Sequence, residues 1–223
     1  MSEMDQGKRT NTIEDESRVL FIEKLDEYIE HEHESDLQAI DLPAAVRKRS
    51  ARQSHGRMRI EEVAFAYGEA FEAAKRDISE EAIERSAEAS SGYPYLIRLI
   101  GYYLMRSKKN PIDVAEADKA IFLAKIELFK NVHDSMFWSL SSKDRMFVWA
   151  MSKDEYDSEF GEIAKRMGVS TGYASKYRER LLNADLIYAS SYGRLTFTLP
   201  YMREYVAKEY IERYGGEGGK ERL

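Results

Sequence analysis

From about residue 58 onward, apolar residues recur every three or four positions, the spacing that gives an α-helix one hydrophobic face. This pattern predicts four helices in the first half of the region. The first spans Ile60–Phe71, and the second begins after Ser79 as its N-cap. The third spans Tyr95–Arg106 and the fourth Val114–Phe129. The third is apolar nearly all round, which is typical of a helix at the centre of a domain. We therefore predict a helical bundle over residues 58–135.

The pattern changes after residue 135. Serines suited to cap a helix N-terminus precede three further helical segments, at Ser142, Ser158 and Ser170. The third of these helices runs to Asn183. Two segments that alternate between apolar and polar residues, the period of a strand, come next: Leu186–Ala189 and Leu195–Leu199. Gly193 supplies a turn between them, and a last helix spans Tyr201–Tyr214. This order predicts a winged helix-turn-helix with a small β-hairpin wing over residues 136–214.

The two ends of the chain differ from this body. A helical pattern begins near residue 12 and has one apolar face, formed by Phe21, Ile22, Leu25 and Ile29. A basic run, Arg47–Arg49, follows it. We interpret residues 1–57 as an acidic N-terminal helical extension with a basic run, and residues 215–223 as a flexible tail. The apolar face either packs on the bundle or pairs with another copy of the chain, which makes a homo-oligomer one expectation.

Composition narrows the classes of protein. The 223 residues are 43% hydrophobic and 33% charged, with a formal net charge of -6. The absence of cysteine excludes disulfides, cysteine-ligated zinc, iron–sulfur clusters and thiol nucleophiles. No stretch approaches eighteen apolar residues and the N-terminus is acidic, so neither a membrane span nor a signal peptide is expected. We expect a soluble, cytoplasmic, mainly α-helical protein with no membrane partner.

Motifs for catalysis are missing from the sequence. It contains no G-x-x-x-x-G-K-[ST] phosphate loop, and also lacks G-x-S-x-G, H-E-x-x-H and G-x-G-x-x-G. His31 and His33 are two residues apart, so they point to different sides of a helix and do not form a metal pair. No nucleophile is matched by a plausible base. We expect no catalysis by this chain alone and no metal.

The candidate chemistry lies on the helix after Ser170. At about 100° per residue, Ala174, Tyr177, Leu181 and Leu182 fall on the inward arc, and Tyr173, Lys176, Glu179, Arg180 and Asn183 fall on the outward arc. Arg178 falls with the inward group and is interpreted as packed or ion-paired. Two outward cations with an aromatic residue near the N-terminal end suit a helix that reads the major groove of DNA.

The predicted wing adds further contacts with the DNA backbone. The predicted DNA-binding set is Ser170, Thr171, Tyr173, Lys176, Arg180, Tyr192 and Arg194. Residues 161–208 carry 8 basic and 4 acidic side chains, a local excess of positive charge in an acidic protein. Glu179 works against this interpretation because it would repel phosphate. A winged helix that docks a protein, rather than DNA, is therefore the alternative.

Three runs of residues carry a resemblance to a known family. The run Ser91–Tyr102, SGYPYLIRLIGY, resembles the start of the lid in AAA+ and STAND-type ATPases of bacteria and archaea. Leu140–Arg145 and Tyr177–Leu182 resemble the winged helix that follows that lid, an order also found in origin-recognition ATPases. The resemblance implies that Gly92 and Pro94 lie against a bound nucleotide. It places a sensor arginine nearby, where this chain has Tyr95, with Arg98 one turn later.

The sequence departs from that family in one large respect, because the nucleotide-binding core that precedes the lid is absent. The resemblance therefore implies the C-terminal part of a longer ATPase or a standalone remnant. ATP is expected as a cofactor only with a separate or missing core. Without that core, Gly92 and Pro94 also fit a plain helix–helix corner.

Three functions remain open at this stage. The first is a module that binds double-stranded DNA, attached to a lid-like bundle. The second is an adaptor that binds an ATPase core or another protein. The third is a regulatory remnant that binds adenine nucleotide weakly at Gly92–Arg98.

Overall fold

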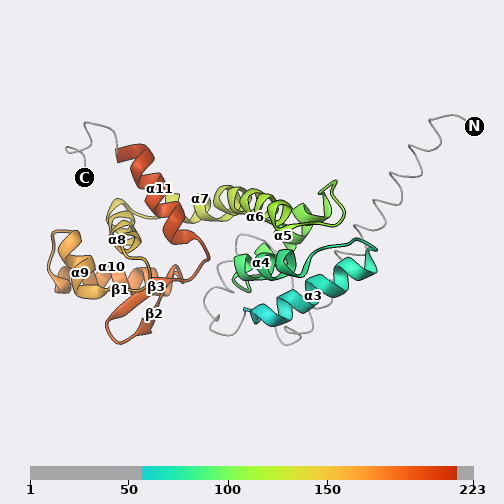
Figure 1. Cartoon of the computed structure of the whole chain (residues 1–223). Coiled ribbons are helices and arrows are strands. Elements are labelled where there is room, and N and C mark those ends of the chain that lie inside the picture. Colours follow the sequence, from blue (N-terminus) through green and yellow to red (C-terminus); the bar gives the residue numbers. More distant parts are fainter. Residues whose placement is uncertain (1–56, 215–223) are drawn as a thin grey trace, which may run out of the picture. The chain divides into compact units, whose positions relative to one another are not determined.

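The computed structural model describes residues 57–214, and Figure 1 shows their helices and strands. The described residues are mainly helical and include one small antiparallel sheet, so the predicted fold class is confirmed. They divide into two compact units, residues 57–127 and 128–214. The predicted bundle limit at residue 135 stays a prediction. The N-terminal extension, its basic run and apolar face, and the tail lie outside the described residues.

Unit 1 contains four helices: α3 (Ile60–Ala73), α4 (Glu80–Ser90), α5 (Pro94–Met105) and α6 (Val114–Leu128). The α3 helix packs on α4, and α4 packs on α5. As predicted, Ser79 is the N-cap of α4, where its hydroxyl accepts a hydrogen bond from the Ala82 amide. The α5 helix is the most buried of the four, as its nearly all-round apolar pattern predicts. Its buried side chains include Leu96, Ile100 and Leu104.

Unit 2 begins with a single π-helical turn, η1 (Phe129–His133), followed by α7 (Asp134–Trp138) and α8 (Ser142–Ser152). A two-residue strand, β1 (Ser158–Glu159), leads into α9 (Phe160–Arg166). The remaining elements are α10 (Thr171–Asn183), β2 (Ile187–Ser191), β3 (Arg194–Phe197) and α11 (Met202–Tyr214). The strands form an antiparallel sheet in the order β1-β3-β2, in which Ser158 pairs with Leu195 and Ile187 pairs with Phe197.

Of the three caps predicted in unit 2, two are wrong and one is confirmed. The N-cap of α8 is Ser141, not Ser142, and its hydroxyl accepts from the Asp144 amide. Ser158 is not a cap but part of β1, because its buried hydroxyl donates to the Met151 carbonyl and its backbone pairs with β3. Ser170 is the N-cap of α10, as predicted, and accepts from the amide of Tyr173.

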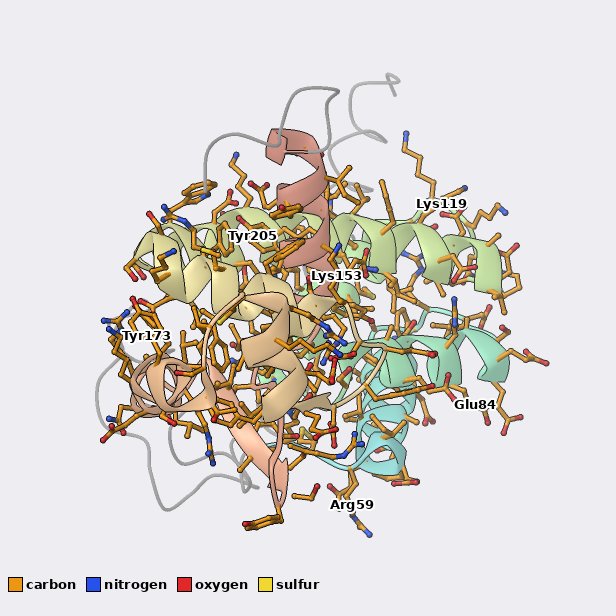
Figure 2. All side chains as sticks on the ribbon, turned by 90° about the vertical axis from the view of Figure 1, so that its left-hand side faces the viewer. Arg59, Glu84, Lys119, Lys153, Tyr173 and Tyr205 are labelled. Carbon is orange, nitrogen blue, oxygen red and sulfur yellow. The ribbon has the colours of Figure 1, made fainter. Side chains whose placement is uncertain are left out.

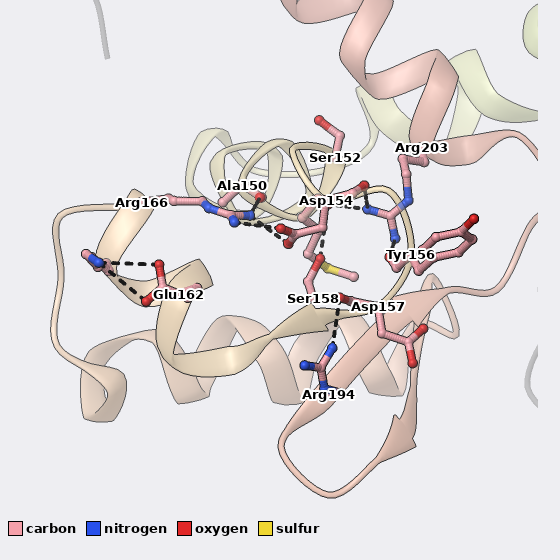
Figure 3. Close-up of polar contacts among 12 residues, drawn as sticks. Ala150, Ser152, Asp154, Tyr156, Asp157, Ser158, Glu162, Arg166, Arg194 and Arg203 are labelled. Atoms are coloured by element: carbon pink, nitrogen blue, oxygen red, sulfur yellow. Dashed lines mark hydrogen bonds and ion pairs between the residues drawn. The ribbon is translucent and has the colours of Figure 1, made fainter.

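Two arginines satisfy the carbonyl groups at the end of α8 (Figure 3). Arg166 donates to the Ala150 carbonyl at 2.7 Å and forms two bonds of 2.6 and 2.7 Å with the Asp154 carboxylate. Arg203, from α11, donates to the carbonyls of Met151, Asp154 and Tyr156. The Met151 carbonyl also accepts from the Asp154 amide at 3.3 Å and from the Ser158 hydroxyl at 3.0 Å, so the two arginines add to a local cap at the end of α8.

An aromatic cluster in the core of unit 2 surrounds a buried histidine. The rings of Phe129 and Tyr205 lie 5.3 and 5.4 Å from that of His133, measured between centroids. Neither ring nitrogen of His133 has a hydrogen-bond partner that meets geometric criteria among the described residues. Burial lowers the pKa of His133 to about 3, and the Pro200 backbone opposes that shift only in part. His133 is therefore neutral in the folded protein at ordinary pH.

Candidate nucleic-acid interface

The exposed face of α10 is the one that its helical period predicts. Ala174, Tyr177 and Leu181 are buried, whereas Tyr173, Lys176, Glu179, Arg180 and Asn183 are exposed. Ser170 and Thr171 are also exposed, at the start of the helix. The Ser170 cap fixes where the helix begins, and the apolar spacing fixes which side turns inward. Five members of the predicted DNA-binding set are therefore accessible on α10 and its cap: Ser170, Thr171, Tyr173, Lys176 and Arg180.

Two tyrosines and a lysine form a cluster on this face. The Lys176 ammonium lies 4.0 Å from the ring centroid of Tyr173 and 4.9 Å from that of Tyr177. The Tyr177 hydroxyl donates to the Tyr173 hydroxyl at 3.0 Å, and this bond, together with the ammonium, lowers the pKa of Tyr173. Tyr173 is 43% exposed and lies at the surface in Figure 2. Cation–π contact holds the Lys176 side chain against the rings, so its charge has a defined position.

Arg180 is exposed, as predicted, but it already has a protein partner. Its guanidinium bonds both oxygens of the Asp144 carboxylate at 2.6 Å and also contacts the Ser141 hydroxyl at 3.1 Å. The Asp144 side chain is only 5% exposed, whereas that of Arg180 is 54% exposed. Arg180 therefore balances a buried carboxylate, which leaves less of its charge for a phosphate than an unpaired cation would offer. Its predicted place in the DNA-binding set stays a prediction.

Arg178 lies on the inner side of α10, as its helical angle predicts. Its side chain is half-buried, and its guanidinium carbon lies 5.1 Å from the ring centroid of Phe160. Its Nε is buried and has no hydrogen-bond partner within residues 57–214. Arg178 therefore packs against the start of α9 and does not extend from the exposed face of α10.

The β2–β3 hairpin presents aromatic side chains rather than charge. Tyr192, in the turn, is fully exposed, and Tyr188 on β2 is about half exposed. Arg194 is exposed and its guanidinium contacts the Asp157 carbonyl at 3.4 Å (Figure 3). Ser190 donates to the Asp157 carboxylate at 2.6 Å. The hairpin packs against α10 through β2, so the turn projects from the same unit as the exposed helix.

Sequence reasoning missed the start of α8 as a neighbour of this face. Lys143 is exposed there, and its charge contributes to the lowered pKa of Tyr173. The Ser141 hydroxyl and Asp144 carboxylate reach Arg180. These residues lie 36 and 39 positions before Arg180, so no local periodicity indicates the contact.

The proposed nucleotide residues Gly92 and Pro94 lie at the corner between α4 and α5. Gly92 has a φ of +67°, and a Cβ placed on it would lie 2.0 Å from the Met58 carbonyl oxygen. The Met58 amide also donates to the Gly92 carbonyl at 3.0 Å. Arg98 is exposed on α5. The chain's own backbone therefore covers the glycine, and this accounts for the missing side chain without a ligand.

One open pocket lies elsewhere in unit 1. It has a volume of about 450 Å³ and is lined by Leu99, Tyr102, Tyr103, Arg106 and Glu127. None of the proposed nucleotide residues lines it. Tyr103 donates to the Glu127 carboxylate at 2.5 Å, and this bond raises the pKa of Tyr103 to about 12.

The described region, residues 57–214, has neither a cluster suited to a metal ion nor a helix suited to a membrane. No group of three or more histidine and carboxylate side chains there is arranged to hold a metal ion. None of its helices combines the length and the apolar character that a bilayer crossing requires.

Comparison with known proteins gives little further information. Residues 130–206 match the model of a family described as a domain of unknown function (DUF8462). No curated protein matches the chain. Among solved structures, a point mutant of Thermotoga maritima RuvB is similar to it with 17% sequence identity and a TM-score of 0.33, over 69% of this chain and 48% of the RuvB chain. This chain spans about half the length of that protein, and a similarity at this level carries no argument about function.

Proposed function

We propose that residues 136–214 are a winged helix-turn-helix that binds double-stranded DNA. The observation that carries the proposal is the exposed face of α10, where a capped helix start presents Lys176 on Tyr173. Lys143 at the start of α8 adds a second exposed cation beside the same tyrosine. A helix that enters the major groove needs cations and small polar groups near its N-terminal end, together with neighbours that reach the phosphates. The element order α8-β1-α9-α10-β2-β3 supports this assignment.

A salt titration with a matched lysine control tests the proposal. Binding of the full chain to a short labelled duplex is measured by fluorescence anisotropy at several salt concentrations. Lys176→Ala should weaken binding and reduce the slope of log K against log salt by about one unit, because one phosphate contact is lost. Lys208→Ala removes the same charge from α11, where Lys208 pairs with Glu212, and should leave the slope unchanged. Equal slopes for the two variants would contradict contact through α10.

A protein-binding adaptor is the second candidate, and the distribution of charge favours it. Glu179 is exposed on α10, the chain as a whole is acidic, and Arg194 is the single cation between residues 187 and 197. The adaptor becomes the better interpretation if the unmodified chain shows no duplex binding even at low salt. Binding of a partner protein to an apolar docking surface would then change little with salt concentration.

For residues 58–135 we propose a lid-like bundle related to those of ATP-binding proteins, without catalysis by this chain alone. The support is the Ser91–Tyr102 run described above. Because Met58 covers Gly92, we expect the chain alone to give no heat on mixing with millimolar ATP in a calorimeter. Saturable heat that is lost in Arg98→Ala would instead favour the regulatory remnant.

A further inference from the structure

The turn of the β2–β3 hairpin holds its aromatic ring entirely in solvent. Tyr192 has a relative exposure of 105%, compared with 75% for Tyr156, the next most exposed large apolar side chain of the described residues. The strands pair as far as Ser191 and Arg194, with an irregularity in register between Ala189 and Ser191, and Gly193 in the turn has a positive φ of +72°. The ring therefore lies at the tip of a short, paired hairpin.

This hairpin is poorly equipped to contact phosphates. Arg194 is its only cation between residues 187 and 197, and the guanidinium lies against the Asp157 carbonyl. The Asp157 carboxylate, which accepts from Ser190, adds negative charge at the hairpin base. A wing that binds the duplex backbone through charge needs free cations at its tip, because phosphate contacts supply most of that affinity. Here the tip offers a ring face and no charge.

An exposed tyrosine ring gains most from a flat apolar partner, and a nucleobase is such a partner. Stacking of a base on an aromatic side chain is worth about 1–3 kcal/mol and does not depend on base identity. Inside a continuous duplex both faces of every base are already covered by neighbouring bases. The ring of Tyr192 can therefore stack only where a base is unpaired or where the duplex ends.

We infer that the target of this module is DNA with a junction between duplex and single strand, where Tyr192 stacks on the first unpaired base. This inference rests on the proposed DNA binding through α10. The α10 face holds the duplex arm by charge, and the wing adds a contact that is neutral and therefore insensitive to salt. A continuous duplex satisfies the first contact but not the second.

The test compares two labelled probes with the full chain: an intact circular duplex, which has no ends, and the same circle with a short single-stranded gap. The unmodified chain should bind the gapped probe about 5- to 150-fold more tightly, the ratio that corresponds to the stacking free energy. Tyr192→Ala should abolish this preference. Tyr192→Trp should retain the preference. Tyr156→Ala removes another exposed tyrosine of unit 2 and should change neither probe.

Each other outcome has a defined meaning. If the chain binds the intact circular duplex with the expected salt slope but shows no preference for the gapped probe, the junction inference is wrong and the proposed function stands. The inference is also wrong if Tyr192→Ala weakens both probes equally, because the ring would then contact paired DNA. If neither probe binds at low salt, both the inference and the proposed function fail, and an adaptor with a tyrosine-tipped wing replaces them.

Discussion

Substituting Gly92 tests how the corner of unit 1 is held together. In Gly92→Ala, the new methyl group would lie 2.0 Å from the Met58 carbonyl oxygen, 3.1 Å from its carbonyl carbon and 3.2 Å from its nitrogen. All three are backbone atoms, so no side-chain rotation relieves the clash. The segment at Met58 must move away from the corner between α4 and α5, or that corner must open.

The free-energy cost can be assembled from separate effects. Placing alanine at a φ of +67° costs about 1–2 kcal/mol. Displacing Met58 breaks its 3.0 Å hydrogen bond to Gly92, worth about 1 kcal/mol. It also exposes the buried Met58 side chain, at about 1.5–3 kcal/mol. Alanine returns about 0.4–1 kcal/mol by restricting the unfolded chain. The expected loss is about 4 kcal/mol, a large part of the stability of a small domain.

Gly168→Ala is the matched control, because Gly168 has the same φ of +67° and no atom within 4 Å of the added Cβ. It should cost only the conformational part, about 1 kcal/mol. Both variants are compared with the unmodified chain by urea unfolding followed by circular dichroism. If Gly92→Ala loses no more stability than Gly168→Ala, Met58 does not pack on the corner as described. In that case Met58 would not cover Gly92, and the glycine would be open to a nucleotide.

Three further variants test individual contacts in unit 2. Arg180→Ala should lower the free energy of unfolding by about 1–3 kcal/mol, since it leaves the Asp144 carboxylate buried without its cation, and Asp144→Asn in the same chain should recover part of the loss. His133→Phe should remove a pH dependence of the free energy of unfolding. His133 is neutral when folded, so the unmodified chain loses about 2 kcal/mol of stability between pH 7 and pH 5 as the unfolded histidine takes up a proton. Urea unfolding of the variant at both pH values should show no such contribution. Arg178→Ala should lower the melting temperature by a few degrees through its lost packing, with no change in DNA affinity; a large loss of affinity would contradict its inward position.

The helices could be predicted wherever local signals agree. For α10, the Ser170 cap and the apolar spacing both act within one helix, and the predicted range Thr171–Asn183 matches the observed one. The strand β1 could not be predicted, because two residues are too few to show an alternating pattern. Its existence depends on pairing between Ser158 and Leu195, far along the chain. The π-helical turn Phe129–His133 left no signal in the hydrophobic period either.

The candidate site shows the same limit. Helical periodicity placed Lys176 and Arg180 on the exposed side of α10, and both are exposed. Periodicity describes the direction of a side chain and not its partner, so the pairing of Arg180 with Asp144 was not predictable. The covering of Gly92 by Met58 was hidden for the same reason, since that contact joins segments that are far apart in the sequence.

The two arginines at the end of α8 also affect the synthesis of the protein. Arg203 follows Met151 by 52 residues, so the ribosome must reach the start of α11 before the carbonyls at the end of α8 gain that partner. At typical elongation rates of about 5–20 residues per second, the helix end waits for several seconds. Unit 2 is thus completed only once its C-terminal helix has been made. A shortened version of the protein that ends before Arg203 loses its hydrogen bonds to the carbonyls of Met151, Asp154 and Tyr156.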